Sequence, residues 1–463
     1  MHIAPARTFR PRLTPLVLTG SLVASSACVA SDPRFGAAHV REELHRQVAS
    51  SAPALAEPMA ATWPPDVDPA DGIDEREAVE LALWNNPGFQ EALAATGFSQ
   101  ADLAQAGLLP NPALSVLFPL GPKQLEFAVG LPFDVLWLRP RRLALARREA
   151  ERVVQLVVQA GLDLVRDVRV ASADLALARD EARLAEQSLS LRTELAEIAQ
   201  RRLEMGDASE LEAAAARLDT YRAREEAQRA DFAADRALRL WRQLLGPPLA
   251  VGEALFLAPA AEPSCGGDPD ALWQEALANR ADLSAAGLTV KAASARAGLA
   301  RAEIFALTGT LDANGSGAKG FEAGPGLGVA LPILNQNQAA RARAAAERAR
   351  AFASRDALRA RVRQDLEDAL ARVHRAIDAR SAWRGSGLAA AAEVLGGTRA
   401  AYGAGELPYL LLLDANRSWL EAQQADARLR AEHRRACAEL ERTIGRRLDP
   451  APGTASAERR RRR

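Results

Sequence analysis

The sequence is poor in aromatic residues and has no excess of charge of either sign. Aromatic residues make up 5% of its 463 residues, too few for the large cores of several ordinary globular domains. Lysine plus arginine and aspartate plus glutamate each number 59, so no net charge attracts nucleic acid. Beyond the N-terminal segment there is no apolar run of about 18 residues, which excludes a membrane-spanning helix. Alanine, leucine, arginine and glutamate dominate instead, and this composition indicates long helices.

The N-terminus has the pattern of a targeting segment. Three arginines precede an apolar stretch from Leu13 to Ala24, and small residues then lead to Cys28. This pattern predicts a signal peptide over residues 1–27. Acylation of Cys28, with chains such as palmitate, is favoured over conventional signal cleavage nearby. Because no aspartate follows Cys28, similarity to bacterial lipoproteins implies the outer membrane as its destination.

Few residues carry reactive side chains, and their patterns are not those of an enzyme. The sequence has neither a glycine-rich phosphate loop nor a Gly-x-Ser-x-Gly motif, and its histidines lack metal-ligand spacing. We therefore expect no catalytic residue, no cofactor and no metal site. Cys265 and Cys437 could pair in an oxidising compartment, although two unpaired, buried thiols are the favoured interpretation. The five histidines are His2, His39, His45, His374 and His433.

The stretch from Arg141 to Leu203 contains no proline and a single glycine, Gly161. Two seven-residue apolar repeats run through it, offset by two residues or about 200° around a helix. A helix with apolar stripes on nearly opposite sides needs a neighbour on each side, which favours a wall of helices about 95 Å long. An ordinary long coiled coil is the alternative. The repeats are Val168, Leu175, Ala182, Leu189, Ala196, Leu203 and Val170, Leu177, Leu184, Leu191, Ile198.

Landmarks recur about 200 residues apart, which indicates a tandem duplication. Leu131-Pro132 returns as Leu331-Pro332, and the turn at Gly206 returns at Gly405. Each half reads as helix, hairpin, long helix, turn and helix. The predicted segments are a leader over 28–74 that tethers the chain, a first repeat over 75–245 with strands at about 113–119 and 124–132, a Gly/Pro-rich linker over 246–269, a second repeat over 270–445 with strands at about 305–313 and 324–332, and a disordered basic tail over 446–463.

The predicted strands alternate between an apolar face and a face of polar and small residues. The polar positions include Gln124, Glu126, Thr308 and Thr310. A sheet in lipid must close on itself, because open edges leave backbone groups without hydrogen bonds. Four strands per chain would close with copies of the same chain, and three copies would give twelve strands and room for a channel. A small soluble sheet on a helical body is the alternative.

The order of these elements resembles the TolC family of outer-membrane efflux proteins, over about residues 75–445. The resemblance rests also on Asn85-Asn86-Pro87, on Leu109-Pro110-Asn111-Pro112 and on the two strand-ending Leu-Pro pairs. Cys28 suggests the lipoprotein branch that serves resistance–nodulation–division pumps. The resemblance implies a mainly α fold with a small β part, in which a homotrimer forms a twelve-stranded outer-membrane barrel continued by a periplasmic α-helical barrel. The linker over 246–269 would lie in an equatorial collar.

The implied function is that of a passive exit duct in a tripartite efflux system, not an enzyme. Its partners would be two further copies of itself, a periplasmic adaptor, an inner-membrane pump and outer-membrane lipid. Asp414 falls where the family has one acidic gate residue, and Leu411 stands where it has another. A solvated helix position is the alternative for Asp414, and a periplasmic coiled-coil lipoprotein without a pore is the alternative function. The tip residues expected to contact the adaptor are Gly206, Asp207, Gly405 and Glu406.

Overall fold

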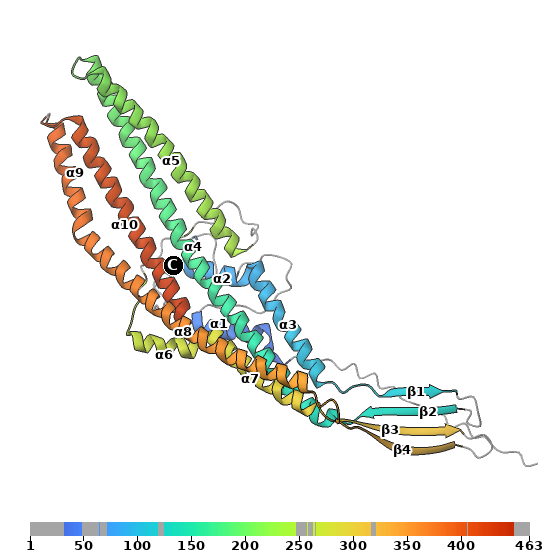
Figure 1. Cartoon of the computed structure of the whole chain (residues 1–463). Coiled ribbons are helices and arrows are strands. Elements are labelled where there is room, and N and C mark those ends of the chain that lie inside the picture. Colours follow the sequence, from blue (N-terminus) through green and yellow to red (C-terminus); the bar gives the residue numbers. More distant parts are fainter. Residues whose placement is uncertain are drawn as a thin grey trace, which may run out of the picture.

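The computed structural model describes residues 32–48, 64, 72–118, 125–246, 257, 263, 265–315, 321–404 and 406–448. The molecule is elongated, with a sheet at one end and two helical hairpins at the other (Figure 1). In chain order the elements are η1 (Pro33–Phe35), α1 (Ala37–Val48), α2 (Glu75–Asn85), α3 (Pro87–Gly107), β1 (Ala113–Leu117), β2 (Leu125–Pro132), α4 (Val135–Glu204), α5 (Glu210–Leu245), α6 (Pro269–Asn279), α7 (Ala281–Ala302), β3 (Ala306–Gly315), β4 (Phe321–Ala330), α8 (Gln338–Ala382), the π-helical turn η4 (Trp383–Gly387), α9 (Leu388–Gly403) and α10 (Tyr409–Ile444).

Helix α4 is the axis of the fold. Its 70 residues correspond to about 105 Å and run from the sheet to the far tip (Figure 1). It begins six residues before the predicted stretch and includes Pro140 near its N-terminus. Helices α3, α5, α7 and α10 all pack against it, so the prediction of neighbours on more than one side is confirmed.

Asn86-Pro87 predicts an interruption in the first helix of the first repeat, over about residues 75–108, and the structure confirms it with a break at Asn86. The Asn86 side chain accepts a hydrogen bond from the Phe89 backbone N–H at 3.0 Å, and Pro87 stands at the first helical position. Its Nδ2 donates to the Leu244 carbonyl at 2.9 Å, which ties the break to the end of α5. Asp74 forms a capping box with Glu77 at the start of α2.

The first helix of the second repeat is also interrupted. The sequence predicts one continuous helix over about residues 270–303, whereas the structure has a break at Arg280. Arg280 has an extended backbone between α6 and α7 and is 4% exposed. Its guanidinium donates to both Asp282 carboxylate oxygens, at 2.9 and 2.6 Å, and to the Thr443 carbonyl at 3.2 Å. The break therefore depends on a tertiary contact with α10, which no local proline or glycine marks. A second difference lies at η4, a π-helical turn that divides the long helix predicted over about residues 338–401 into α8 and α9.

The sequence predicts that the leader is a tether with one short helix near residues 39–49, whereas in the structure the leader contributes to the core. Helix α1 confirms that short helix, and its Val40 and Leu44 are completely buried. Leu44 fills the space that the missing side chain of Gly161 leaves on α4. The same core contains Phe89 of α3 and Trp241 of α5, whose indole N–H donates to Ser172 Oγ at 2.9 Å. This core surrounds the middle of α4 and holds the start of both repeats together.

The four strands form one antiparallel sheet in the order β1-β2-β3-β4. Strands β2 and β3 come from different repeats and pair from Leu125↔Gly315 to Pro132↔Thr308. The sheet therefore joins the two halves at the end opposite the helical tips. Within the described strands, β1 and β4 each keep one edge without a neighbour. Among the described residues, no helix combines the length and the apolar character needed to cross a membrane.

Candidate functional site

The sheet has two chemically different faces, as the alternation predicts. Directly opposed residues of antiparallel strands point to the same side, so the register assigns every strand position to a face. The apolar face carries Leu114, Val116, Leu125, Phe127, Val129, Leu131, Leu307, Leu311, Leu327 and Val329. The polar face carries Ser115, Glu126, Thr308, Thr310, Asp312, Asn314 and Glu322, with small residues between most of them.

Large side chains on the apolar face are exposed in a single chain. Leu114 is 66% exposed, Leu311 54% and Leu327 65%. Water alone would not stabilise such a continuous apolar surface, whereas lipid would. On this face the ring of Phe133 occupies the space above Gly309, where any Cβ would lie 2.4 Å from the ring. Leu117 departs from the pattern because it lies on the polar face.

The α4–α5 tip is a tight turn built around Gly206. Gly206 has φ +82°, a left-handed conformation that glycine adopts without strain. The Asp207 N–H donates to the Arg202 carbonyl at 2.8 Å, which closes the end of α4 as a Schellman motif. Ser209 with Glu212 predicts a capping box, and the structure has one half of it: the Ser209 hydroxyl caps α5 by accepting from the Glu212 N–H at 3.1 Å. Gly206 and Asp207 are both exposed, so this tip is open to contact.

The α9–α10 tip repeats the same closure. The Glu406 N–H donates to the Ala401 carbonyl at 2.9 Å, which matches the bond of Asp207 in the first tip. Glu406 is exposed. Gly405 lies outside the described residues. The sequence predicts Pro408 at the first helical position of the last helix. In the structure Pro408 is the N-cap of α10, which begins one residue later at Tyr409.

Asp414 and Leu411 lie in the first two turns of α10, and both are exposed. The charge of Asp414 contributes to the raised pKa of Arg417, after the Arg417 hydrogen bond and ion pair with Glu421 at 2.8 Å. Leu412 lies between them on the buried side and packs with Leu195 of α4. A carboxylate therefore projects from α10 next to the tip.

Below the tips, acids of α4 pair with arginines of α10. Asp163 accepts from Arg442 at 2.7 Å, and Asp174 pairs with Arg435. Asp180 pairs with Arg430 at 3.3 Å and Glu181 with Arg428 at 3.0 Å. The order is antiparallel along both helices. It stops at Glu181, and the contact nearer the tips is apolar.

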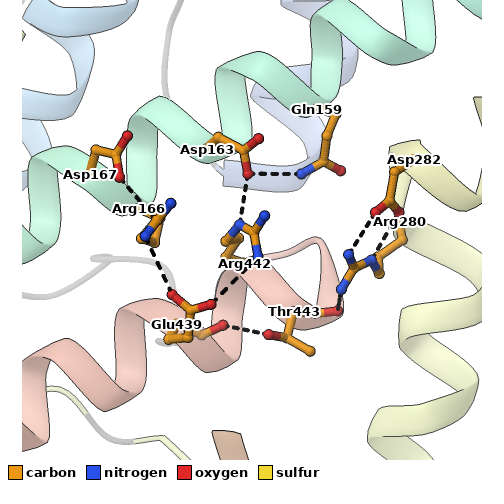
Figure 2. Close-up of polar contacts among 9 residues, drawn as sticks. All are labelled: Gln159, Asp163, Arg166, Asp167, Arg280, Asp282, Glu439, Arg442 and Thr443. Carbon is orange, nitrogen blue, oxygen red and sulfur yellow. Dashed lines mark hydrogen bonds and ion pairs between the residues drawn. The ribbon is translucent and has the colours of Figure 1, made fainter. Parts of the chain in front are cut away.

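At the base of this series the charged groups form a network (Figure 2). Arg442 bridges Asp163 and Glu439, while Arg166 contacts Asp167 at 3.0 Å and Glu439 at 3.7 Å. Burial raises the pKa of Asp167. The nearby carboxylates of Asp163 and Glu439 act in the same direction, and the guanidinium groups of Arg166 and Arg442 act against it. The network fixes α10 on α4 at mid-height of the molecule.

The two cysteines contradict one sequence interpretation, and a histidine lies beside them. Cys265 and Cys437 form a disulfide with Cα atoms 5.7 Å apart, so the interpretation as unpaired thiols is wrong. His433 lies beside them on α10, four residues before Cys437. This i, i+4 spacing puts both side chains on one helix face, and it is the signal that the sequence reasoning missed. Cys28 lies outside the described residues, as does Gln124.

Comparison with known proteins identifies the second repeat by sequence. Residues 272–446 match the sequence profile described as Outer membrane efflux protein. The resemblance to the outer-membrane efflux proteins is confirmed. No curated protein matches the sequence. The match covers less than half of the chain, so it shows that residues 272–446 form a domain similar to those of outer membrane efflux proteins.

Solved structures show the same fold over most of the chain. A membrane protein from Pseudomonas aeruginosa is 22% identical with a TM-score of 0.69, covering 86% of this chain and 100% of its own. CusC, whose structures concern folding and transmembrane channel formation, is 20% identical with a TM-score of 0.67 and coverages of 86% and 100%. The open-state outer membrane channel MtrE of Neisseria gonorrhoeae is 18% identical with a TM-score of 0.65 and coverages of 88% and 100%.

Proposed function

We propose that this chain is the outer-membrane exit duct of a tripartite efflux system. Three copies would close their sheets into one barrel, with the apolar faces toward lipid and the polar faces toward the lumen. The observation that carries the proposal is the sheet, whose two faces differ in every described strand and whose outer strands each have an open edge. An open apolar sheet needs both lipid and neighbouring strands, and closure supplies the missing hydrogen bonds.

The helices would continue the barrel as a periplasmic tube. Helices α4 and α8–α9 start beside the sheet and end at the tips (Figure 1). The shorter pairs α3 with α5 and α7 with α10 pack along them. The tips with Gly206, Asp207, Gly405 and Glu406 would receive the adaptor of an inner-membrane pump. Acylation of Cys28 would add a lipid anchor to the barrel.

Asp414 would form a ring of three carboxylates at the periplasmic entrance, with Leu411 as an apolar neighbour. Carboxylates held close together attract cations. Asp414→Asn should therefore weaken the block of single-channel current by divalent cations by about tenfold. Glu421→Gln is the matched control, because the Glu421 carboxylate is already neutralised by its ion pair with Arg417. Equal block in the wild type and Asp414→Asn would remove Asp414 from the entrance.

Electron microscopy of the detergent-purified full chain tests the duct itself. End views should show threefold particles with a central stain-filled hole, and side views a tube on the order of 100 Å beyond the detergent belt. Cys28→Ser should remain in the outer membrane, because the barrel holds it there. Thin rods, or release of Cys28→Ser into the soluble fraction, would instead support a coiled-coil lipoprotein without a pore.

A further inference from the structure

Three side chains with metal-ligand chemistry meet where the segment before α6 crosses α10. Cys265 comes from that segment, and His433 and Cys437 come from one face of α10. One ligand atom from each residue lies within 4.8 Å of the other two. In the oxidised chain the two sulfurs are joined as a disulfide. The sequence separation between Cys265 and His433 is 168, so only the fold brings the group together.

His433 is the observation that points to a ligand. His433 is 6% exposed and Cys437 is 3% exposed, so both are buried. The Nε2 of His433 faces Cys265 Sγ at 3.8 Å, so this ring nitrogen is the one directed at the cysteine pair.

We propose that, when the disulfide is reduced, Cys265, His433 and Cys437 bind a zinc ion. Two thiolates and one imidazole are a common zinc ligand set, with water in the fourth position. Ligands of one tetrahedral zinc lie about 3.6 Å apart for nitrogen and sulfur and about 3.8 Å apart for two sulfurs. The observed distance from Nε2 to Cys265 Sγ is already 3.8 Å. The sulfurs need only separate by side-chain rotation, because Cα atoms 5.7 Å apart suit both states.

The redox step is an exchange with a dithiol reductant. The dithiol transfers two electrons and two protons to the Cys265–Cys437 bond and becomes a cyclic disulfide. The chain is left with two thiols. Zinc binding then displaces both thiol protons, and the two thiolates balance the charge of the dication.

On reduction, the zinc ion would replace the disulfide as the link between the segment before α6 and α10. Both the disulfide and the zinc ion would hold the segment leading into α6 against α10, which also packs on α4, α6 and α8. The proposal goes beyond the duct function and does not depend on it. A chain without a pore would contain the same three side chains.

The test is zinc binding to the folded, detergent-purified full chain in two redox states. One sample is reduced with dithiothreitol under anaerobic conditions and freed of reductant, and the other is left oxidised. Each is titrated with zinc chloride, and bound metal is measured by atomic spectroscopy after gel filtration. The reduced chain should bind one zinc and the oxidised chain none. Cobalt(II) in place of zinc should give thiolate-to-metal charge-transfer absorption from two sulfurs.

Variants separate this site from adventitious binding. Cys437→Ser and His433→Ala should each weaken zinc binding at least tenfold, and His433→Cys should restore it because sulfur is also a zinc ligand. His374→Ala, which removes an exposed histidine of α8, should bind like the wild type. The proposal is overturned if the reduced wild type binds no zinc, or binds it no more tightly than Cys437→Ser. It is also overturned if the folded chain cannot be reduced by the dithiol.

Discussion

Gly161 is the one glycine between Arg141 and Leu203, and its surroundings explain its presence. A Cβ at this position would lie 2.7 Å from Leu44 Cδ1 and 3.2 Å from the Phe89 ring. We predict that Gly161→Ala lowers the thermal midpoint, because overpacking costs about 1–3 kcal/mol and outweighs the better helix propensity of alanine, about 1 kcal/mol. Scanning calorimetry of the detergent-purified chain measures the change.

The matched control is Gly298→Ala in α7, where an added Cβ meets nothing within 4 Å. Only the propensity term acts there, so its thermal midpoint should rise. If Gly161→Ala also raises the midpoint, Leu44 moves aside at little cost. Helix α1 then packs less tightly on α4 than the complete burial of Leu44 indicates.

Asp163 and Asp167 lie one turn apart on α4, and we predict opposite effects on removing their charges. Asp163 accepts from Arg442 at 2.7 Å, so Asp163→Asn should lower the thermal midpoint at pH 7. Burial raises the pKa of Asp167, so the fold disfavours its charge. Asp167→Asn should therefore raise the midpoint at pH 7.

The pH dependence provides the check. A raised folded pKa means that the folded chain binds the Asp167 proton more tightly than the unfolded chain does. This contribution to stability is present below the unfolded pKa of about 3.9 and is lost as pH rises through the folded value. The advantage of Asp167→Asn should thus shrink as the pH is lowered from 7 toward 4. An advantage independent of pH would mean that the charge of Asp167 does not cause it, and that the neutral amide simply packs or hydrogen-bonds better at this position.

At the scale of elements, the sequence predicts a boundary correctly where a residue ends a helix or strand through its own backbone preference. Asn86-Pro87, Gly206 and the Leu-Pro pairs mark their boundaries in the sequence, and the structure confirms them. The break at Arg280 is invisible locally, because its guanidinium must find the Thr443 carbonyl 163 residues away. The burial of α1 and the approach of Cys265 to His433 are likewise products of distant contacts. Periodicity predicts which face of a helix is buried but not which partner covers it.

The α4–α5 tip depends on the left-handed backbone conformation of one residue, Gly206, so a single substitution can test it. Proline fixes φ at about −65° and removes the N–H that donates to the Leu203 carbonyl. Gly206→Pro should therefore open the α4–α5 turn, accelerate hydrogen exchange over residues 201–209 and abolish export in the native host, with outer-membrane insertion unchanged. Gly206→Asn should behave like the wild type because asparagine tolerates the left-handed conformation. Normal export by Gly206→Pro would exclude this tip from docking.

At the scale of the whole molecule, the duplication places equivalent features at the same ends. Both hairpins of strands meet in one sheet at one end, and both helical turns form tips at the other (Figure 1). The ion pairs between α4 and α10 and the β2–β3 pairing connect the two repeats at mid-height and at the sheet. The apolar face is the part of this arrangement that a lone chain leaves unsatisfied.

Neighbouring residues of β3 on opposite faces test that arrangement directly. Leu311 lies on the apolar face and Thr310 on the polar face, and both are exposed in the single chain. Leu311→Arg should remove the protein from the outer membrane, because arginine facing the lipid costs about 2–4 kcal/mol per chain at mid-depth. Thr310→Arg should still insert and should reduce single-channel conductance or shift its selectivity toward anions. Fractionated membranes and planar bilayer recordings measure the two outcomes. Equal insertion of both variants would mean that the apolar face does not meet lipid, and a soluble sheet on a helical body would then be the better description.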